Sequence, residues 1–240
     1  MRGTKLEAKA IFVTYSVQHL EDLLEVIEEA GVKAIDVIPA PITLGNLVLS
    51  ERQKIVGVAL VAIGDQTTSL SVFENGLLIS MQTFSIGSAD ITNDIALGLK
   101  IPLDSAERMK KGIMDDDIPN RKLKEIIEAR LSDIFELIDN HFKKIKRSGL
   151  LPAGVVFVGG GANIKELEEL SKTILKLPAS IGSTEIWGNA KTKLRDSAWF
   201  TALGLLISAK DNENYGGGSM TNLFRDFKNA IKSSIKQLMP

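Results

Sequence analysis

A polar turn between two predicted strands, residues 63–69, has the composition of a phosphate-binding loop. It contains Gly64 and two adjacent hydroxyl residues, Thr67 and Thr68. Backbone N–H groups and hydroxyls in a tight turn can converge on an anion, because each presents the positive end of a dipole. The turn therefore predicts a phosphate site, with an ordinary polar hairpin turn as the alternative.

Three consecutive glycines, Gly159, Gly160 and Gly161, follow a short apolar stretch and precede a predicted helix. Glycine has no side chain, so a ligand can lie directly against the backbone near the amides that open a helix. The run therefore predicts a second part of a ligand site. The alternative is that these glycines only allow the helix to pack closely on the strand.

Glu107 and Lys110 stand three residues apart in a predicted helix, residues 104–111, so they share one helix face. A carboxylate acceptor beside an ammonium donor could bind the vicinal hydroxyls of a sugar. A surface ion pair between the two side chains is the alternative. Asp104, three residues before Glu107, is expected to cap this helix.

The end of the chain, residues 222–240, has the pattern of a basic amphipathic helix. Its apolar side chains fall within an arc of roughly 120° on a helix: Leu223, Phe224, Phe227, Ile231, Ile235 and Leu238. The cations lie beside and opposite this stripe: Arg225, Lys228, Lys232 and Lys236. A polar, glycine-rich stretch, residues 211–221, precedes it and is predicted to be a flexible linker. A tethered basic helix is typical of a membrane-surface anchor; a packed or partner-binding helix is the alternative.

The elements that must position these groups form an α/β pattern. Residues 57–86 are typical of three antiparallel strands, with Asn75-Gly76 as a hairpin turn between the last two. Helices are expected over residues 17–30, 44–49, 90–99, 121–146, 164–175 and 197–209. Further short strands are expected over residues 6–14, 33–38, 154–158 and 179–181. A meander followed by alternating strands and helices is an α/β layout.

The composition narrows the class of protein. With 29 basic and 30 acidic residues the net charge is −1, so we expect no nucleic-acid partner. The absence of cysteine excludes disulfides and thiolate sites, and two histidines leave little for a zinc site, so we assign no catalytic residue and no metal ligand. The longest apolar run, residues 197–209, is shorter than the roughly 20 residues of a membrane span. Without a secretory signal pattern, a cytoplasmic location is expected.

The hairpin turn, the 104–111 helix and the glycine turn, in this order, resemble the actin and Hsp70 ATPase superfamily. The segments VGVALVAIGDQTTSLSVFENG, FSIGSADITNDIALGL, IIEARLSDIFELI and VVFVGGGANIKELEEL resemble the FtsA family of bacterial actin homologues, across most of residues 1–210. The resemblance implies an α/β, actin/Hsp70-like (RNase H-like) fold, present in part, with a C-terminal amphipathic helix. It implies ATP, with Mg²⁺, as a possible cofactor. The nucleotide-binding residues would be Gly64, Thr67, Thr68, Glu107, Lys110, Gly159, Gly160 and Gly161.

The chain departs from the family pattern at two acidic positions. Where the family turn usually is Asp-Ile-Gly-Gly-Gly-Thr-Thr-Asp, this chain has Ala62 at the first position and Asp65 at the fourth, with Ser69 last. Ala62 cannot position a magnesium ion, and the Asp65 carboxylate should repel phosphate. We therefore expect the adenosine part to dominate any nucleotide binding, and no significant hydrolysis. Residues 1–56 contain neither the family's first phosphate loop nor most of its FtsZ-side subdomain, so we expect a truncated chain or a lost half of the cleft.

The resemblance implies a cell-division scaffold that tethers FtsZ filaments to the membrane and self-assembles. Its partners would be FtsZ, further copies of the chain and membrane lipid, at the cytoplasmic face of the division site. The expected domains are a remainder of a first lobe (1–56), a second lobe (57–210), the linker (211–221) and the anchor helix (222–240). The alternatives are an actin-like adaptor of type IV pilus assembly, or an ATPase or sugar kinase of the same superfamily.

Overall fold

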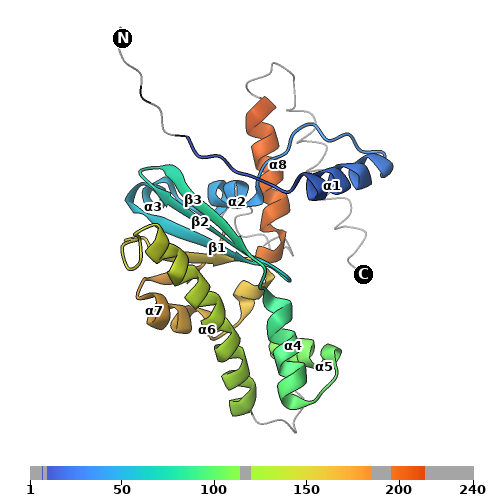
Figure 1. Ribbon diagram of the computed structural model, residues 1–240, viewed down its shortest axis with the longest axis vertical. Helices are drawn as coiled ribbons and strands as arrows, with labels where there is room; N and C mark the ends of the chain where they lie inside the picture. Colours follow the sequence, from blue (N-terminus) through green and yellow to red (C-terminus); the bar gives the residue numbers. More distant parts are fainter. Residues whose placement is uncertain (1–6, 8–9, 114–119, 185–195, 214–240) are drawn as a thin grey trace, which may run out of the picture.

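The computed structural model describes residues 7, 10–113, 120–184 and 196–213, and these residues form an α/β fold on one five-stranded sheet (Figure 1). The strand order is β3-β2-β1-β4-β5. The antiparallel meander consists of β1 (Val58–Ile63), β2 (Thr68–Glu74) and β3 (Leu77–Phe84). Next to β1, β4 (Val155–Val158) and β5 (Ala179–Ile181) run parallel to it. The predicted α/β layout is confirmed.

The hairpin turn between β2 and β3 has the predicted geometry. Asn75 and Gly76 both have positive φ, 54° and 77°. A type I′ turn requires positive φ at both central residues, and it matches the twist of the strands that it joins. The turn also docks on the preceding short helix, because the Asn75 and Gly76 amides donate to the carbonyls of Ile55 and Lys54.

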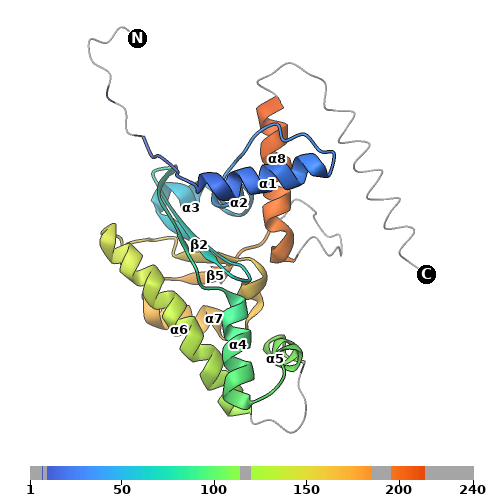
Figure 2. The ribbon, with the colours of Figure 1, turned by 45° about the vertical axis from the view of Figure 1, so that its right-hand side comes forward.

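Two apolar layers cover the sheet, one on each face. Successive strand residues point to opposite faces, so Val61 and Ile63 of β1 pack in one layer while Val58 and Leu60 pack in the other. Figures 1 and 2 show α6 and α7 against the first face and α2 and α8 against the second. Because both faces are covered, β1 is apolar along its whole length.

The helices of the first face are α4 (Ser88–Leu99), α5 (Leu103–Lys110), α6 (Asn120–Lys144) and α7 (Leu167–Leu175). Those of the second face are α2 (Ala40–Val48), the short α3 (Glu51–Val56) and α8 (Phe200–Glu213). The 3₁₀ turn η1 (Gly160–Asn163) includes the last two glycines of the run, and the 3₁₀ turn η3 (Ser197–Trp199) precedes α8. In both views α4 and α5 extend beyond the sheet, at the end opposite α1 (Figure 2).

The helix α1 (Val17–Glu29) forms as predicted, but it contributes nothing to the core. None of its residues is buried against the described part of the chain. The segments on either side of it, 10–14 and 33–38, pair with none of the described strands, so the strands predicted there are wrong for these residues. An alternating apolar pattern makes a strand only where a neighbouring strand supplies backbone hydrogen bonds.

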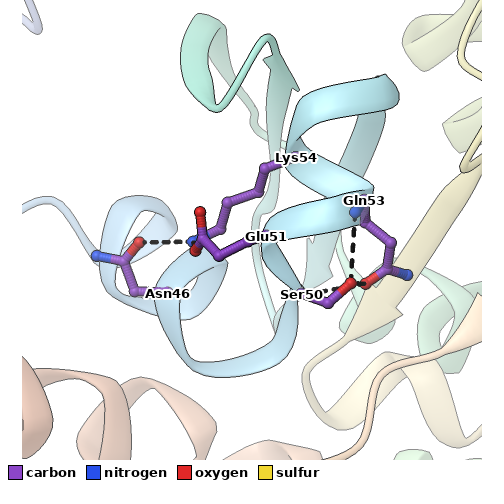
Figure 3. A network of polar contacts seen from close by, with 5 residues as sticks. All are labelled: Asn46, Ser50, Glu51, Gln53 and Lys54. Atoms are coloured by element: carbon purple, nitrogen blue, oxygen red, sulfur yellow. Dashed lines mark hydrogen bonds and ion pairs between the residues drawn. The ribbon is translucent and has the colours of Figure 1, made fainter.

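A polar network fixes the corner between α2 and α3 (Figure 3). Ser50 caps α3, because its hydroxyl accepts from the Gln53 amide while the Gln53 side chain accepts from the Ser50 amide at 2.9 Å. The buried Lys54 ammonium donates to Asn46 of α2 at 3.1 Å and pairs with Glu51 at 3.0 Å. The Ser-x-x-Gln capping box is the sequence signal that could have predicted α3.

Two predicted features need correction. Pro102 is the N-cap of α5, and Asp104 lies within the first turn with no capping hydrogen bond, so the Asp104 cap is wrong. A carboxylate there still favours the helix through the macrodipole. The helix α8 runs to Glu213, so residues 211–213 of the predicted linker are helical. The rest of the linker and the anchor segment, 222–240, lie outside the described residues. None of the described helices is long and apolar enough to cross a membrane.

Candidate ligand site at the ends of two parallel strands

A cavity of about 800 Å³ opens where the parallel strands β1 and β4 end. This edge is where open α/β sheets commonly bind ligands. Three groups far apart in the sequence meet there: the β1–β2 turn, the glycine turn after β4, and α5 with the first residue of α4. Seven of the eight residues predicted for the nucleotide line it: Gly64, Thr67, Glu107, Lys110, Gly159, Gly160 and Gly161. The structure thus brings the three predicted groups to one place, and their nucleotide role stays a prediction.

Thr68 is the residue of the predicted set that does not line the cavity. Its side chain is fully buried, and its hydroxyl donates to the Ile86 carbonyl at 2.8 Å. Thr68 is the first residue of β2, and neighbouring side chains at a strand alternate in direction, so Thr67 reaches the cavity while Thr68 does not. Its hydroxyl therefore has a structural partner rather than a place in the site.

The β1–β2 turn is held rigidly against the start of α4. The Ser88 amide donates to the Gly64 carbonyl at 2.9 Å, and the Ala89 amide donates to the Asp65 carbonyl at 2.8 Å. Gly87 permits this approach, since a Cβ there would lie 2.3 Å from the Asp65 carbonyl oxygen. These first amides of α4 are already occupied by the turn. An anion in the cavity would therefore have to be bound by other donors. Asp65, which also lines the cavity, adds negative charge there.

The three glycines of the second turn have different roles. Gly159 has φ of 90°, and a Cβ there would lie 2.4 Å from the Ile63 carbonyl oxygen. A Cβ on Gly161 would lie 2.3 Å from Ile63 Cγ2, whereas a Cβ on Gly160 would meet nothing within 4 Å. Gly159 and Gly161 therefore allow the ends of β1 and β4 to approach, and Gly160 leaves open space in the cavity.

Glu107 and Lys110 form a partly buried ion pair rather than a surface pair. Lys110 Nζ lies 2.6 Å from Glu107 Oε2, and its side chain is only 7% exposed, against 37% for Glu107. Partial burial opposes ionisation of Glu107, but hydrogen bonds from Lys110, Thr92 and Lys111 outweigh it and lower the pKa of Glu107 to about 2. The carboxylate is therefore an ionised acceptor at neutral pH.

The cavity has further walls that sequence patterns did not indicate. Ala40, Pro41 and Leu44 of α2 supply an apolar wall. On the side of η3, Asp196 Oδ1 accepts from the Ala198 amide at 3.1 Å, and the Ser197 hydroxyl donates to the Gly159 carbonyl at 2.7 Å. No local pattern links these segments to the glycine turn, because only the tertiary fold brings them together. An apolar wall beside polar acceptors suits a ligand with a flat apolar ring and a hydroxylated part.

The acidic side chains of the lining do not form a metal site. Within the described ranges, no three histidine, aspartate or glutamate side chains come close enough to hold a metal ion. Ala62 lines the cavity with a methyl group at the first position of the turn. The cavity thus has no carboxylate at position 62 to place a magnesium ion, while the partly exposed Glu107 and the apolar wall suit the sugar and ring of a nucleotide.

The family model and the relatives that match this chain all belong to one family of cell division proteins. The family model described as "Cell division protein FtsA" matches residues 59–204, which include every lining segment except α2. The chain is 30% identical to the cell division protein FtsA of Bacillus subtilis, over 90% of this chain and 53% of the relative. It is 27% identical to that of Pseudomonas aeruginosa, over 90% of this chain and 57% of the relative. The chain thus spans a little over half the length of these relatives.

Solved structures share the fold at lower sequence identity. MreB5 of Spiroplasma citri bound to ADP superposes with a TM-score of 0.69 at 18% identity, over 85% of this chain and 69% of that chain. The PilM-PilN type IV pilus biogenesis complex gives a TM-score of 0.65 at 16% identity, over 79% of this chain and 57% of that chain. These likenesses confirm the predicted actin-like fold and say nothing more of this chain's ligands.

Proposed function

Because the chain belongs to the FtsA family, we propose that it is an actin-like cell-division scaffold that tethers FtsZ filaments to the inner face of the cytoplasmic membrane. The observation that carries this proposal is the match of residues 59–204 to the family model, which spans the sheet and most of the cavity. The partners are FtsZ, further copies of the chain and membrane lipid. The location is peripheral, at the division site.

The membrane part of the proposal depends on residues 222–240. Their pattern supports an interfacial helix, with the apolar stripe in the acyl boundary and the four cations at the headgroups. The same segment favours a role in cell division over the alternative role as a type IV pilus adaptor. The likeness to the PilM-PilN complex supports the fold alone. A superfamily kinase or ATPase would need a catalytic carboxylate in the cleft, and Ala62 removes the obvious one.

The cavity is proposed to bind adenine nucleotide without hydrolysing it. Glu107 is the acceptor for the sugar hydroxyls, Gly160 leaves room for the nucleoside, and α2 supplies the apolar wall. Magnesium, when bound with the nucleotide, would neutralise phosphate charge. Asp65 lies in the turn that would bind the phosphates and lines the cavity, so its charge disfavours a triphosphate there.

Hydrolysis of ATP by the purified chain is expected to stay at background. Ala62 cannot hold a metal or activate water, and Asp65 repels the transferring phosphate. Phosphate release with ATP and Mg²⁺ measures this, with Thr67→Ala and Glu107→Ala variants as controls for a contaminating activity. Turnover well above background that both variants abolish would contradict the proposal.

Tethering is tested by sedimentation of FtsZ filaments with liposomes that contain anionic lipid. We expect FtsZ to pellet with liposomes only when the full chain is present, because the chain bridges the two. A chain without residues 220–240 controls for direct binding of FtsZ to lipid. If the chain pellets with lipid and FtsZ stays in the supernatant, the chain is a membrane protein without the tethering role.

A further inference from the structure

The hydroxyl of Thr92, on α4, lies between the two charged groups of the cavity. Thr92 is buried, with 7% of its surface exposed. Lys110 Nζ donates to Thr92 Oγ1 at 2.7 Å, and Thr92 Oγ1 lies 2.6 Å from Glu107 Oε2. A third neighbour, the Ser88 carbonyl, lies at 3.3 Å. The residue therefore connects α4 to both functional side chains of α5.

The chemistry of the three groups fixes the direction of each hydrogen bond. An ammonium only donates and a carboxylate only accepts, whereas a hydroxyl has one proton and two lone pairs. Thr92 must therefore accept from Lys110 and donate to Glu107, which is nearer than the Ser88 carbonyl. Valine has nearly the same shape and can do neither, while serine can do both.

Lys110 has no free donor to offer a ligand within the described structure. Its three N–H groups are directed to the Ser88 carbonyl at 3.0 Å, to Thr92 Oγ1 and to Glu107 Oε2. Both Lys110 and Glu107 line the cavity, but the side chain of Lys110 is 7% exposed and that of Glu107 is 37% exposed. Glu107 is thus the side chain of this set that can meet a ligand, and Lys110 holds it in place.

We propose that Thr92 is a positioning residue that makes the cavity selective for ribonucleotides over 2′-deoxyribonucleotides. Together with Lys110, it occupies Oε2 of Glu107 and holds the carboxylate in one orientation. Oε1, whose other partner is the exposed Lys111 at 3.1 Å, is then left to accept from the 2′ hydroxyl of a ribose. A sugar that lacks the 2′ hydroxyl cannot form that hydrogen bond in the partly buried site, and sites built for a hydroxyl discriminate strongly against its absence. This inference depends on the proposed nucleotide site.

The test compares binding of ADP and 2′-deoxy-ADP to the full chain by titration calorimetry, for the wild type, Thr92→Val and Thr92→Ser. We expect the wild type to prefer ADP at least tenfold, Thr92→Val to bring the ratio of the two affinities near one, and Thr92→Ser to preserve it. A purely structural role would weaken both ligands equally and leave the ratio unchanged. Thermal melting checks the fold, and Thr92→Ala replaces the valine variant if that variant unfolds.

Each of the other outcomes overturns either the nucleotide site, its selectivity or the role of Thr92. A wild-type chain that binds neither ligand overturns the nucleotide site itself, and the inference with it. A wild type that binds both equally leaves the nucleotide site standing and overturns the selectivity. An unchanged ratio in Thr92→Val, or a ratio lost in Thr92→Ser, shows that the Thr92 hydroxyl does not position Glu107.

Discussion

Gly160→Leu is expected to lower the affinity for nucleotide at least a hundredfold, while the chain stays folded. A side chain at this position meets no atom within 4 Å of its Cβ and extends into the cavity that the ligand needs. Its φ is not in the left-handed region, so the substitution carries no backbone strain. We expect the free energy of unfolding to change by only about 0.5 kcal/mol, as for other substitutions that meet open space.

Gly159→Ala is the matched control, one residue away, with the opposite expected pattern. The backbone there has φ of 90°, and the added Cβ would lie 2.4 Å from the Ile63 carbonyl oxygen. Strain and overpacking together should cost roughly 2–4 kcal/mol. Denaturant unfolding measures the cost, and nucleotide titration measures affinity for both variants. Wild-type affinity in a folded Gly160→Leu chain would remove the glycine turn from the site, and wild-type stability in Gly159→Ala would contradict the close contact with Ile63.

The parts of the fold that were predicted from sequence are those with local causes. The Asn75-Gly76 turn follows from the conformations of two residues, and both have the positive φ that the pattern requires. β1 and β4 are apolar throughout because helices cover both of their faces. Segments 10–14 and 33–38 have strand-like patterns as well. They are not strands, because strand formation depends on a neighbour that no local pattern reveals.

The residues of the candidate site were predicted from their types, but the hydrogen bonds and ion pairs between them were not. Lys110 lines the cavity as predicted for a ligand-binding residue, but besides Glu107 it also contacts Ser88 and Thr92, 22 and 18 residues earlier in the chain. Such contacts arise only when α4 and α5 pack together. Thr68 shows the same limit, since one step along a strand reverses the direction of a side chain.

The double substitution Phe224→Glu and Phe227→Glu is expected to release the chain from anionic liposomes. Burial of a phenylalanine side chain contributes about 1.5–3 kcal/mol, so the loss of two should weaken binding more than a hundredfold. Because the lost interaction is hydrophobic and the new charges face the acyl boundary, high salt should not restore binding. Co-sedimentation at low and at physiological salt measures both effects.

Two further variants separate the contribution of the predicted apolar stripe from that of the charge of residues 222–240. Asn229→Glu with Ser233→Glu makes the same change in charge on the polar face, and Lys232→Gln with Lys236→Gln removes two cations. Each cation contributes about 1 kcal/mol near an anionic leaflet, so both variants should lose roughly thirtyfold in affinity at low salt. That loss should shrink at physiological salt, where screening acts over about 8 Å. Equal losses in the two glutamate variants at every salt concentration would mean that residues 222–240 bind lipid through charge alone. Unchanged liposome binding in the double phenylalanine variant would remove the anchor role and leave the cell-division proposal resting on the match to the family model.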